Sequence, residues 1–250
     1  MPECMKREAH SQHHEDIMVT AALRCMKNGR PGTFVELGAF TGVALSNTVM
    51  LERCYNYTGV LIEASPINYA KLKTSGRQAT LVHSAVCPTE GTVMFQDESD
   101  GNGDYSGEID LRHLNRKETL AKVHNRSYVT VPCRPLGKIL DDTGYAAIDI
   151  LFLDVEGAEG KVLASVDLKR FSVVVMEAAE YPNDGGRLRN QLEPMLRDAG
   201  FQRQRAMEDE RRGQWNPAYV RVGSVNDTCV SCMRSQACRN AFFRDAPSLR

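Results

Sequence analysis

The stretch Thr33-Phe-Val-Glu-Leu-Gly-Ala-Phe-Thr-Gly42 carries the first indication of the architecture. Its apolar start predicts a strand over about 33–37, and the periodicity that follows predicts a helix over about 43–54. Gly38 and Gly42 lie in the turn, where a missing Cβ lets the backbone approach a ligand closely. Glu36 is a carboxylate in an otherwise apolar strand and requires a partner. A strand that turns sharply into a helix at glycines is typical of a nucleotide-type cofactor site.

The spacing of these glycines does not match the G-x-G-x-x-G pattern of dinucleotide-binding enzymes, because Phe40 occupies a glycine position. A second apolar strand over about 58–63 ends in Glu63, 25 residues after Gly38. A carboxylate near that spacing binds the ribose hydroxyls of a nucleotide in doubly wound sheets. The alternative interpretations are an ordinary tight turn at Gly38 and a solvated strand end at Glu63.

Further strands are predicted over about 80–86, 148–153 and 172–176, with helices between them. The predicted fold is therefore α/β: a Rossmann-like, doubly wound and mostly parallel sheet. Phe201 and residues 219–222 predict an antiparallel edge pair. Residues 91–95 and 128–133 predict an inserted hairpin, with a lid over about 97–126. We expect a loose segment over 1–16, the folded domain over 17–224 and a cysteine-containing tail over 225–250.

The most apolar strand runs into the acidic turn Asp154-Val-Glu-Gly-Ala-Glu159. Open α/β sheets bind ligands at the carboxyl ends of their strands, so Asp154 and Glu156 are site candidates. Glu159 is better explained as an acid in the first turn of a helix.

The formal net charge of −1 gives no electrostatic reason to expect a nucleic-acid or anionic-membrane partner. No apolar run approaches the roughly 20 residues of a membrane helix. Among eight cysteines, Cys54 and Cys87 are expected as small core residues. For Cys229, Cys232 and Cys238, a zinc site, a local disulfide and free thiols all stay open. The compartment is open too: cytoplasmic by default, or a secretory lumen, which three triplets of the glycosylation type at Asn56, Asn125 and Asn226 favour.

The sequence resembles the FkbM-type methyltransferases, a branch of the class I S-adenosylmethionine-dependent enzymes. The resemblance rests on residues 34–42, 46–48, 59–66 and 153–159, and it departs mildly at Thr41. It implies S-adenosylmethionine as the cofactor, with the Gly38–Gly42 turn near its methionine part. Glu63 would bind the ribose hydroxyls. The remaining cofactor-binding positions are Glu36, Ala39, Ala64, Ser84, Ala85 and Asp154.

We therefore expect O-methylation of a hydroxyl on a sugar or small metabolite, with Asp154 and Glu156 as the catalytic candidates and no metal. His83, His113 and His124 are weaker candidates for a base. The alternative is a non-catalytic binding or trafficking module on the same fold. The turn with Phe40 disfavours a nicotinamide-dependent oxidoreductase. The sequence predicts neither the acceptor nor the oligomeric state.

Overall fold

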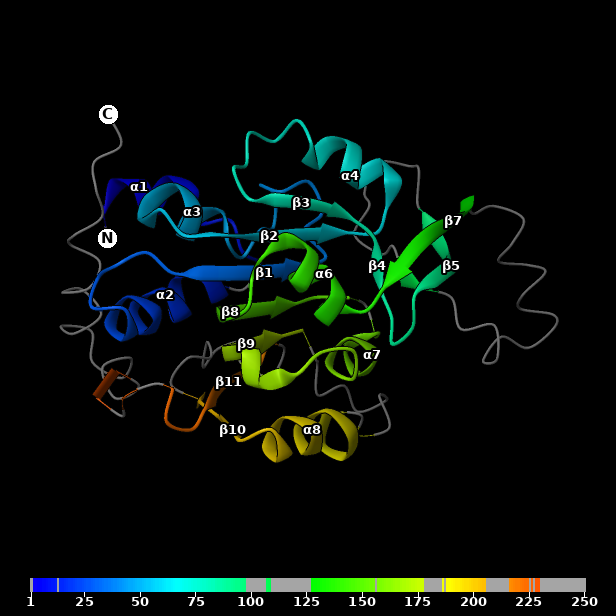
Figure 1. Cartoon of the computed structure of the whole chain (residues 1–250). Helices are drawn as coiled ribbons and strands as arrows, with labels where there is room; N and C mark the ends of the chain where they lie inside the picture. The colour runs from blue at the N-terminus through cyan, green and yellow to red at the C-terminus, as the bar shows by residue number, and fades with distance from the viewer. Residues whose placement is uncertain are drawn as a thin grey trace.

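A seven-stranded sheet with the order β10-β11-β9-β8-β1-β2-β3 forms the centre of the protein (Figure 1). The computed structural model describes residues 2–12, 14–97, 107–108, 127–155, 157–177, 186, 188–205, 216–224, 226 and 228–229. The strands are β1 (Thr33–Leu37), β2 (Thr58–Glu63), β3 (Thr80–His83), β8 (Ile148–Leu153), β9 (Phe171–Met176), β10 (Phe201–Arg203) and β11 (Ala218–Arg221). The first five are parallel, and β11 is antiparallel to both β9 and β10. The predicted α/β sheet with an antiparallel edge is confirmed.

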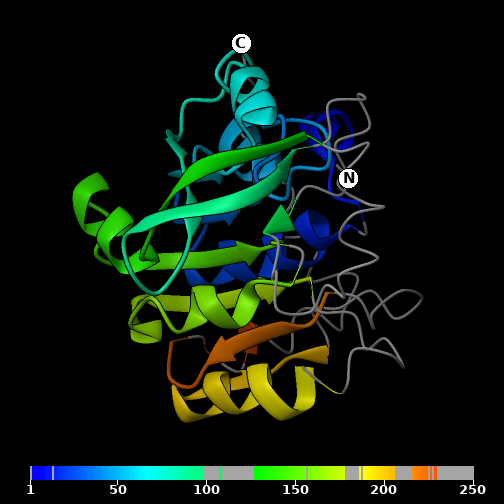
Figure 2. The ribbon, with the colours of Figure 1, turned by 90° about the vertical axis from the view of Figure 1, so that its right-hand side faces the viewer.

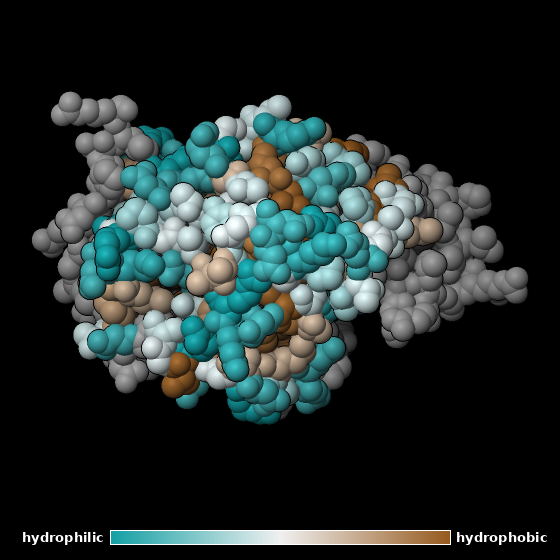
Figure 3. Space-filling view, in the orientation of Figure 1, coloured by the Kyte–Doolittle hydropathy of each residue, from teal (hydrophilic) through white to brown (hydrophobic). Residues whose placement is uncertain are grey.

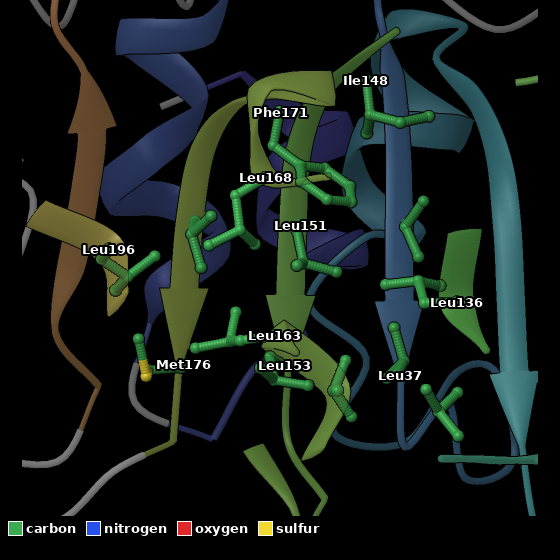
Figure 4. Packing of buried hydrophobic residues seen from close by; sticks show 14 of the residues in the cluster. Leu37, Leu136, Ile148, Leu151, Leu153, Leu163, Leu168, Phe171, Met176 and Leu196 are labelled. Carbon is green, nitrogen blue, oxygen red and sulfur yellow. The ribbon is translucent and has the colours of Figure 1, made fainter. Parts of the chain in front are cut away.

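Helices cover both faces of this sheet. They are α1 (Glu3–Glu8), α2 (Glu15–Met26), α3 (Val49–Tyr55), α4 (Pro66–Leu72), α6 (Leu136–Thr143), α7 (Glu159–Leu163), the short turns η1 (Leu168–Arg170) and η2 (Leu188–Leu192), and α8 (Glu193–Asp198). Since side chains alternate along a strand, Phe34 packs on the side of α1 to α3, and Val35 and Leu37 pack on the other side. Figure 4 shows this second cluster, which includes Leu151 and Phe171.

The order of the strands defines where a ligand binds in such a sheet. From β1 the chain adds β2 and then β3 on one side, and later adds β8 and then β9 on the other. The winding direction therefore reverses between β1 and β8. Ligands of open α/β sheets bind at such a point, beyond the carboxyl ends of the strands.

A second sheet with the order β4-β7-β5-β6 lies beyond this carboxyl edge (Figures 1 and 2). It contains β4 (Ala85–Val86), β5 (Gly91–Asp97), β6 (Gly107–Glu108) and β7 (Ser127–Arg134). The antiparallel pairing of β5 with β7 confirms the predicted hairpin. The strand predicted over 80–86 is divided at Ser84, because β3 joins the large sheet and β4 the small one. Apart from Asp97 and β6, the lid predicted over 97–126 lies outside the described residues.

Two predictions about the early chain were wrong. The helix expected over 43–54 begins only at Val49, because Glu36 binds the three preceding residues in a loop. The N-terminal segment expected to be loose forms α1, where Met5 is fully buried and Cys4 bonds to Cys54. Burial and a covalent bond thus order a segment whose polar composition gives no sign of it.

All six cysteines in the described residues form disulfides: Cys4 with Cys54, Cys25 with Cys229, and Cys87 with Cys133. Of the two expected small core residues, Cys54 is fully buried in the core and Cys87 is partly exposed, and both are disulfide-bonded. Cys229 bonds to α2 rather than locally within its own cluster, while Cys232 and Cys238 lie outside the described residues. The partners are 46 to 204 residues apart, so sequence spacing could not reveal them.

The surface seen in Figure 3 is largely hydrophilic, with scattered apolar residues. The large exposed apolar side chains among the described residues are Leu45, Ile67, Met94 and Val222. In the same part of the chain, none of the helices combines the length and the apolar character needed to cross a membrane.

Candidate cofactor and acceptor site

Hydrogen bonds join the carboxyl ends of five strands into one continuous edge. Across it, four backbone N–H groups donate to backbone carbonyl oxygens of the neighbouring strand. These pairs are Glu177 to Leu153 (2.8 Å), Asp154 to Leu37 (3.3 Å), Gly38 to Ile62 (3.1 Å) and Ser84 to Glu63 (3.1 Å). The predicted site positions Gly38, Glu63, Ser84 and Asp154 therefore lie along one edge, which spans the reversal of winding between β1 and β8.

Glu63 is held in a fixed orientation at the end of β2. One carboxylate oxygen accepts the N–H of Phe40 at 2.7 Å, and the other accepts the N–H of Ser65 at 2.8 Å. The residue is only 6% exposed. Because a carboxylate can accept about four hydrogen bonds, these two backbone donors do not by themselves exhaust it. Glu63 also links the second strand to the glycine turn of the first.

Gly38 has a structural reason for its lack of a side chain. Its φ of +75° favours glycine, but an added Cβ would lie 2.0 Å from the backbone oxygen of Asp154. Gly38 thus permits a close approach between the ends of β1 and β8. The neighbouring Ala39 is 1% exposed and, like Gly38, donates its N–H to Ile62.

Gly42 also has a structural reason for its lack of a side chain. An added Cβ would lie 2.4 Å from Leu72 Cδ1, and φ is +81°. Its carbonyl oxygen accepts a hydrogen bond from Arg77 at 2.6 Å. The turn is thereby packed onto α4 and onto the buried arginine.

Glu36 is satisfied by groups of the protein itself. Its oxygens accept from the Ser46 hydroxyl (2.9 Å), Asn47 N–H (2.7 Å) and the Thr48 hydroxyl (2.5 Å). Arg77 Nη1 lies 4.0 Å from the same carboxylate, and both side chains are nearly inaccessible. Glu36 therefore shapes the loop that follows the glycine turn, which makes it a positioning residue for the site.

Burial raises the pKa of Glu36 above its ordinary value, although Arg77 and the hydrogen bonds of Thr48, Asn47 and Ser46 oppose this effect. Arg77 also lies beside Glu52, with 3.1 Å between Nε and Oε2. One buried cation thus serves two buried carboxylates. The sequence did not single out Arg77, since its partners come from three separate segments.

The other end of the edge holds Ser84 and Ala85, two of the cofactor-binding positions that the family resemblance implies. Ser84 is 1% exposed, and its hydroxyl donates to the carbonyl oxygens of Ala85 (2.6 Å) and Pro132 (3.2 Å). His83 Nε2 lies 3.1 Å from the oxygen of Ala64, and its ring stacks on Tyr69 at 4.7 Å. These contacts hold His83 at the end of β3, which β2 and β1 separate from β8 and Asp154.

A pocket that is open to solvent lies at the ends of β8 and β9. Its lining residues are Gln12, Glu15, Leu45, Asn47, Phe152, Leu153, Asp154, Val175, Glu177 and Asn216. Of the sequence candidates within the described residues, only Asp154 lines it. Glu156, the second catalytic candidate, lies outside the described residues, as do His113 and His124.

The segment before α2 closes one side of this pocket. Asp16 is fully buried and accepts hydrogen bonds from the Ser11 hydroxyl (2.6 Å), His10 N–H (3.1 Å) and Ile17 N–H (2.7 Å). Burial raises the pKa of Asp16 above its ordinary value. Asp16 thereby fixes the backbone that leads to Gln12. Next to it, Asn216 donates to Glu15 across a sequence separation of 201 residues.

Sequence reasoning missed most of this lining. Glu177 could have been found, because it follows an apolar strand just as Asp154 does. Gln12, Glu15 and Asn216 had no such signal, since they converge only in the folded chain. No group of three or more metal-ligating side chains occurs within the described ranges.

The family of methyltransferase FkbM domains matches residues 36–203, about two thirds of the chain. No curated protein matches the sequence significantly. The similar solved structures include a methyltransferase FkbM from Methylobacillus flagellatus KT (13% identity, 76% of this chain and 43% of that chain, TM-score 0.46). They also include a precorrin-6y C5,15-methyltransferase from Geobacter metallireducens GS-15 (14% identity, 81% and 85%, TM-score 0.40). A third is CalS10, an amino pentose methyltransferase from Micromonospora echinaspora with bound SAM (12% identity, 88% and 96%, TM-score 0.45).

With TM-scores below 0.5, these structural likenesses say nothing of what this chain binds. The chain spans less than half of the FkbM structure from Methylobacillus. The family match itself extends from Glu36 in β1 to Arg203 in β10, and so includes Gly38, Glu63, Ser84 and Asp154. The chain therefore belongs to the FkbM methyltransferase domain family.

Proposed function

We propose that this protein transfers the methyl group of S-adenosylmethionine to a hydroxyl of a sugar or small metabolite. The observation that carries the proposal is the hydrogen-bonded edge that joins Asp154, Gly38, Glu63 and Ser84 across the reversal of winding. Each of these residues follows or ends a different strand. Family membership supports methyl transfer, and the identity of the acceptor is our inference.

The chemistry along the edge fits the parts of this cofactor. Glu63 is fixed by two backbone donors at the position where a carboxylate meets ribose hydroxyls. Such hydrogen bonds to a charged acceptor are stronger than neutral ones. The adenine would lie towards Ser84, Ala85 and Ala64. The methionine part would lie between the turn at Gly38 and Ala39 and the carboxylate of Asp154.

When bound, S-adenosylmethionine supplies an activated methyl group, so the protein has to align the acceptor oxygen and remove its proton. Asp154 lies where the cofactor edge meets the pocket. We assign it to the orientation of the methionine end, where a carboxylate attracts the cationic amino and sulfonium groups. Glu156, two residues further on, is the proposed base for the acceptor hydroxyl.

The composition of the pocket supports a small acceptor rich in hydroxyl groups. Glu15, Asp154 and Glu177 supply hydrogen-bond acceptors, while Gln12, Asn47 and Asn216 supply amides that both donate and accept. The Asn47 side-chain oxygen is buried without a hydrogen-bond partner, which leaves an acceptor for a ligand hydroxyl. Phe152 and Val175 add apolar surface on which a sugar ring can pack.

Thermal unfolding with S-adenosylmethionine, S-adenosylhomocysteine and NAD tests the cofactor. A ligand at 100 times its dissociation constant stabilises the native state by about 2.7 kcal/mol. We expect both adenosyl ligands to raise the unfolding temperature and NAD to leave it unchanged. If neither adenosyl ligand raises the unfolding temperature, the proposal is overturned.

Transfer of a labelled methyl group to a panel of sugars and small alcohols then tests catalysis. We expect a labelled methyl ether with at least one acceptor. Binding of both adenosyl ligands without transfer to any acceptor would favour a non-catalytic binding module instead.

A further inference from the structure

We propose that Asn56 is an N-glycosylation site and that the chain folds in an oxidising secretory compartment. Two independent observations support this proposal: the disulfides among the described cysteines, and the exposure of the triplet Asn56-Tyr-Thr58. Neither observation depends on the methyl-transfer function.

Each of the three disulfides joins two segments that are far apart in the sequence. Cys4–Cys54 joins α1 to α3, Cys25–Cys229 joins α2 to the segment after β11, and Cys87–Cys133 closes the small sheet. Their Cα atoms are 5.8, 5.5 and 5.8 Å apart, which is the ordinary span of a disulfide. Every cysteine in the described residues is paired. Such pairing is rare in cytosolic proteins, where thiols are kept reduced, and is typical of secreted and luminal ones.

The triplet lies between the end of α3 and the start of β2. Asn56 and Thr58 are both exposed, whereas Tyr57 between them is 1% exposed and packs in the core. Asn56 ends the helix in a left-handed conformation (φ 56°), with its backbone N–H bonded to Glu52 and Leu51. Asn56 and Thr58 are thus accessible at the surface, while Tyr57 between them anchors the backbone. This is the arrangement that a surface glycan requires.

The position of Asn56 is compatible with an active site. Thr58 pairs with Thr33 at the amino end of β1, whereas Glu63, Gly38 and Asp154 lie at the carboxyl ends. A glycan at Asn56 would therefore project from the edge of the sheet opposite to the site. In the triplet immediately before Cys229, Asn226 and Thr228 are also exposed, and Asn125 lies outside the described residues.

In the proposed modification, the side-chain amide nitrogen of Asn56 forms a bond to the anomeric carbon of a lipid-linked oligosaccharide diphosphate. The bond between that carbon and the diphosphate oxygen breaks, the lipid diphosphate leaves, and the amide loses one proton. The donor is a general constituent of the secretory pathway. No oxidant or reductant takes part in this step.

The test begins with full-length protein from the cells that make it, alkylated at lysis and mapped by mass spectrometry without reduction. We expect the peptide containing Asn56 to carry an N-glycan, and a disulfide-linked peptide to contain Cys25 and Cys229. Unmodified Asn56 would overturn the site whatever the state of the thiols. Alkylated Cys25 and Cys229 would overturn the compartment.

A matched pair of exposed-residue variants, produced through the secretory pathway, tests the triplet itself. Thr58→Ala destroys the triplet and should remove one glycan from the mass of the protein, whereas Thr58→Ser preserves it and should keep the full mass. Both variants should bind S-adenosylhomocysteine with the wild-type affinity, because residue 58 lies away from the cofactor edge. Equal glycan content in the two variants would show that Asn56 is not modified.

Discussion

Arg77 provides the sharpest test of how the protein supports the loop beside the cofactor turn. Its guanidinium is inaccessible to solvent and lies against two buried carboxylates, Glu36 at 4.0 Å and Glu52 at 3.1 Å. It also donates to the Thr48 hydroxyl at 2.7 Å and to the Gly42 carbonyl at 2.6 Å. Arg77→Met would leave both carboxylates without a cation in the interior.

Removing one member of a buried ion pair costs about 3–5 kcal/mol. This loss is large beside the roughly 5–15 kcal/mol by which domains are stable. Denaturant unfolding measures it directly, as a lower midpoint with an unchanged slope. Arg53→Met is the matched control, because Arg53 is 31% exposed and Glu8 would keep its second ion pair, with Arg7. We expect that control to cost no more than about 1 kcal/mol.

The pH dependence of the same variant adds a second check. Burial raises the pKa of Glu36 above its ordinary value, and Arg77 opposes that rise. Without Arg77 the pKa rises further, so the ionised form of Glu36 destabilises the native state at neutral pH. As the pH falls through the folded-state pKa, the native state takes up a proton and the cost is relieved. The destabilisation of Arg77→Met should therefore shrink as the pH falls towards 4.5.

Two results would refute this reasoning. The first is a loss of stability in Arg77→Met no greater than that in Arg53→Met. The second is a loss that does not change between neutral pH and pH 4.5. The double variant Arg77→Met with Glu36→Gln should recover part of the stability, because the uncompensated charge is gone.

Three further predictions concern the strand edge and the covalent links. Gly38→Ala should lower the free energy of unfolding by about 1–2 kcal/mol for its left-handed backbone and by about 1–3 kcal/mol for overpacking against Asp154. Gly76→Ala is the control, because Gly76 is also left-handed but has open space around it. Denaturant unfolding of this control should show only the backbone cost. Asp154→Asn should weaken S-adenosylhomocysteine binding in calorimetry. Glu156→Gln should bind this ligand normally, but its rate of methyl transfer should fall by a factor on the order of 10²–10⁴. The reverse pattern would exchange the two roles. Cys25→Ala should lower the free energy of unfolding by about 2–5 kcal/mol, because it opens the longest covalent loop, and an unchanged unfolding midpoint would mean that this disulfide is absent in solution.

The sequence predicted the large sheet well because its strands are short apolar runs that end in charged or glycine residues. Leu37-Gly38, Glu63 and Leu153-Asp154 are such boundaries, and parallel strands necessarily bring them to one edge. The local pattern failed where tertiary contacts prevailed. The residues before Val49 have a helical pattern, yet Glu36 binds Ser46, Asn47 and Thr48 in a loop.

The pocket and the disulfides were beyond the reach of local patterns for a different reason. Asn216 meets Glu15 from 201 residues away, and Cys25 bonds to Cys229 across 204 residues. No periodicity or motif connects such positions in a single sequence. The same holds for Arg77, whose charge is balanced only once Glu36 and Glu52 are brought beside it.

The proposed function depends most directly on Glu63 binding the ribose hydroxyls of an adenosyl cofactor. Glu63 also orients the turn through Phe40 N–H, so a loss of affinity in Glu63→Gln alone would not separate the two roles. The decisive measurement compares S-adenosylhomocysteine with its 2′,3′-dideoxy analogue by calorimetric titration on the wild type and on Glu63→Gln. Glu90→Gln, an exposed carboxylate paired with Lys138, is the control.

The wild type and the control should prefer the hydroxylated ligand by about 1.5–3 kcal/mol, the range for hydrogen bonds to a charged group. Glu63→Gln should lose most of that preference. An equal preference for the hydroxylated ligand in Glu63→Gln and the wild type would rule out the ribose role of Glu63, and no binding of S-adenosylhomocysteine by the wild type would rule out the cofactor.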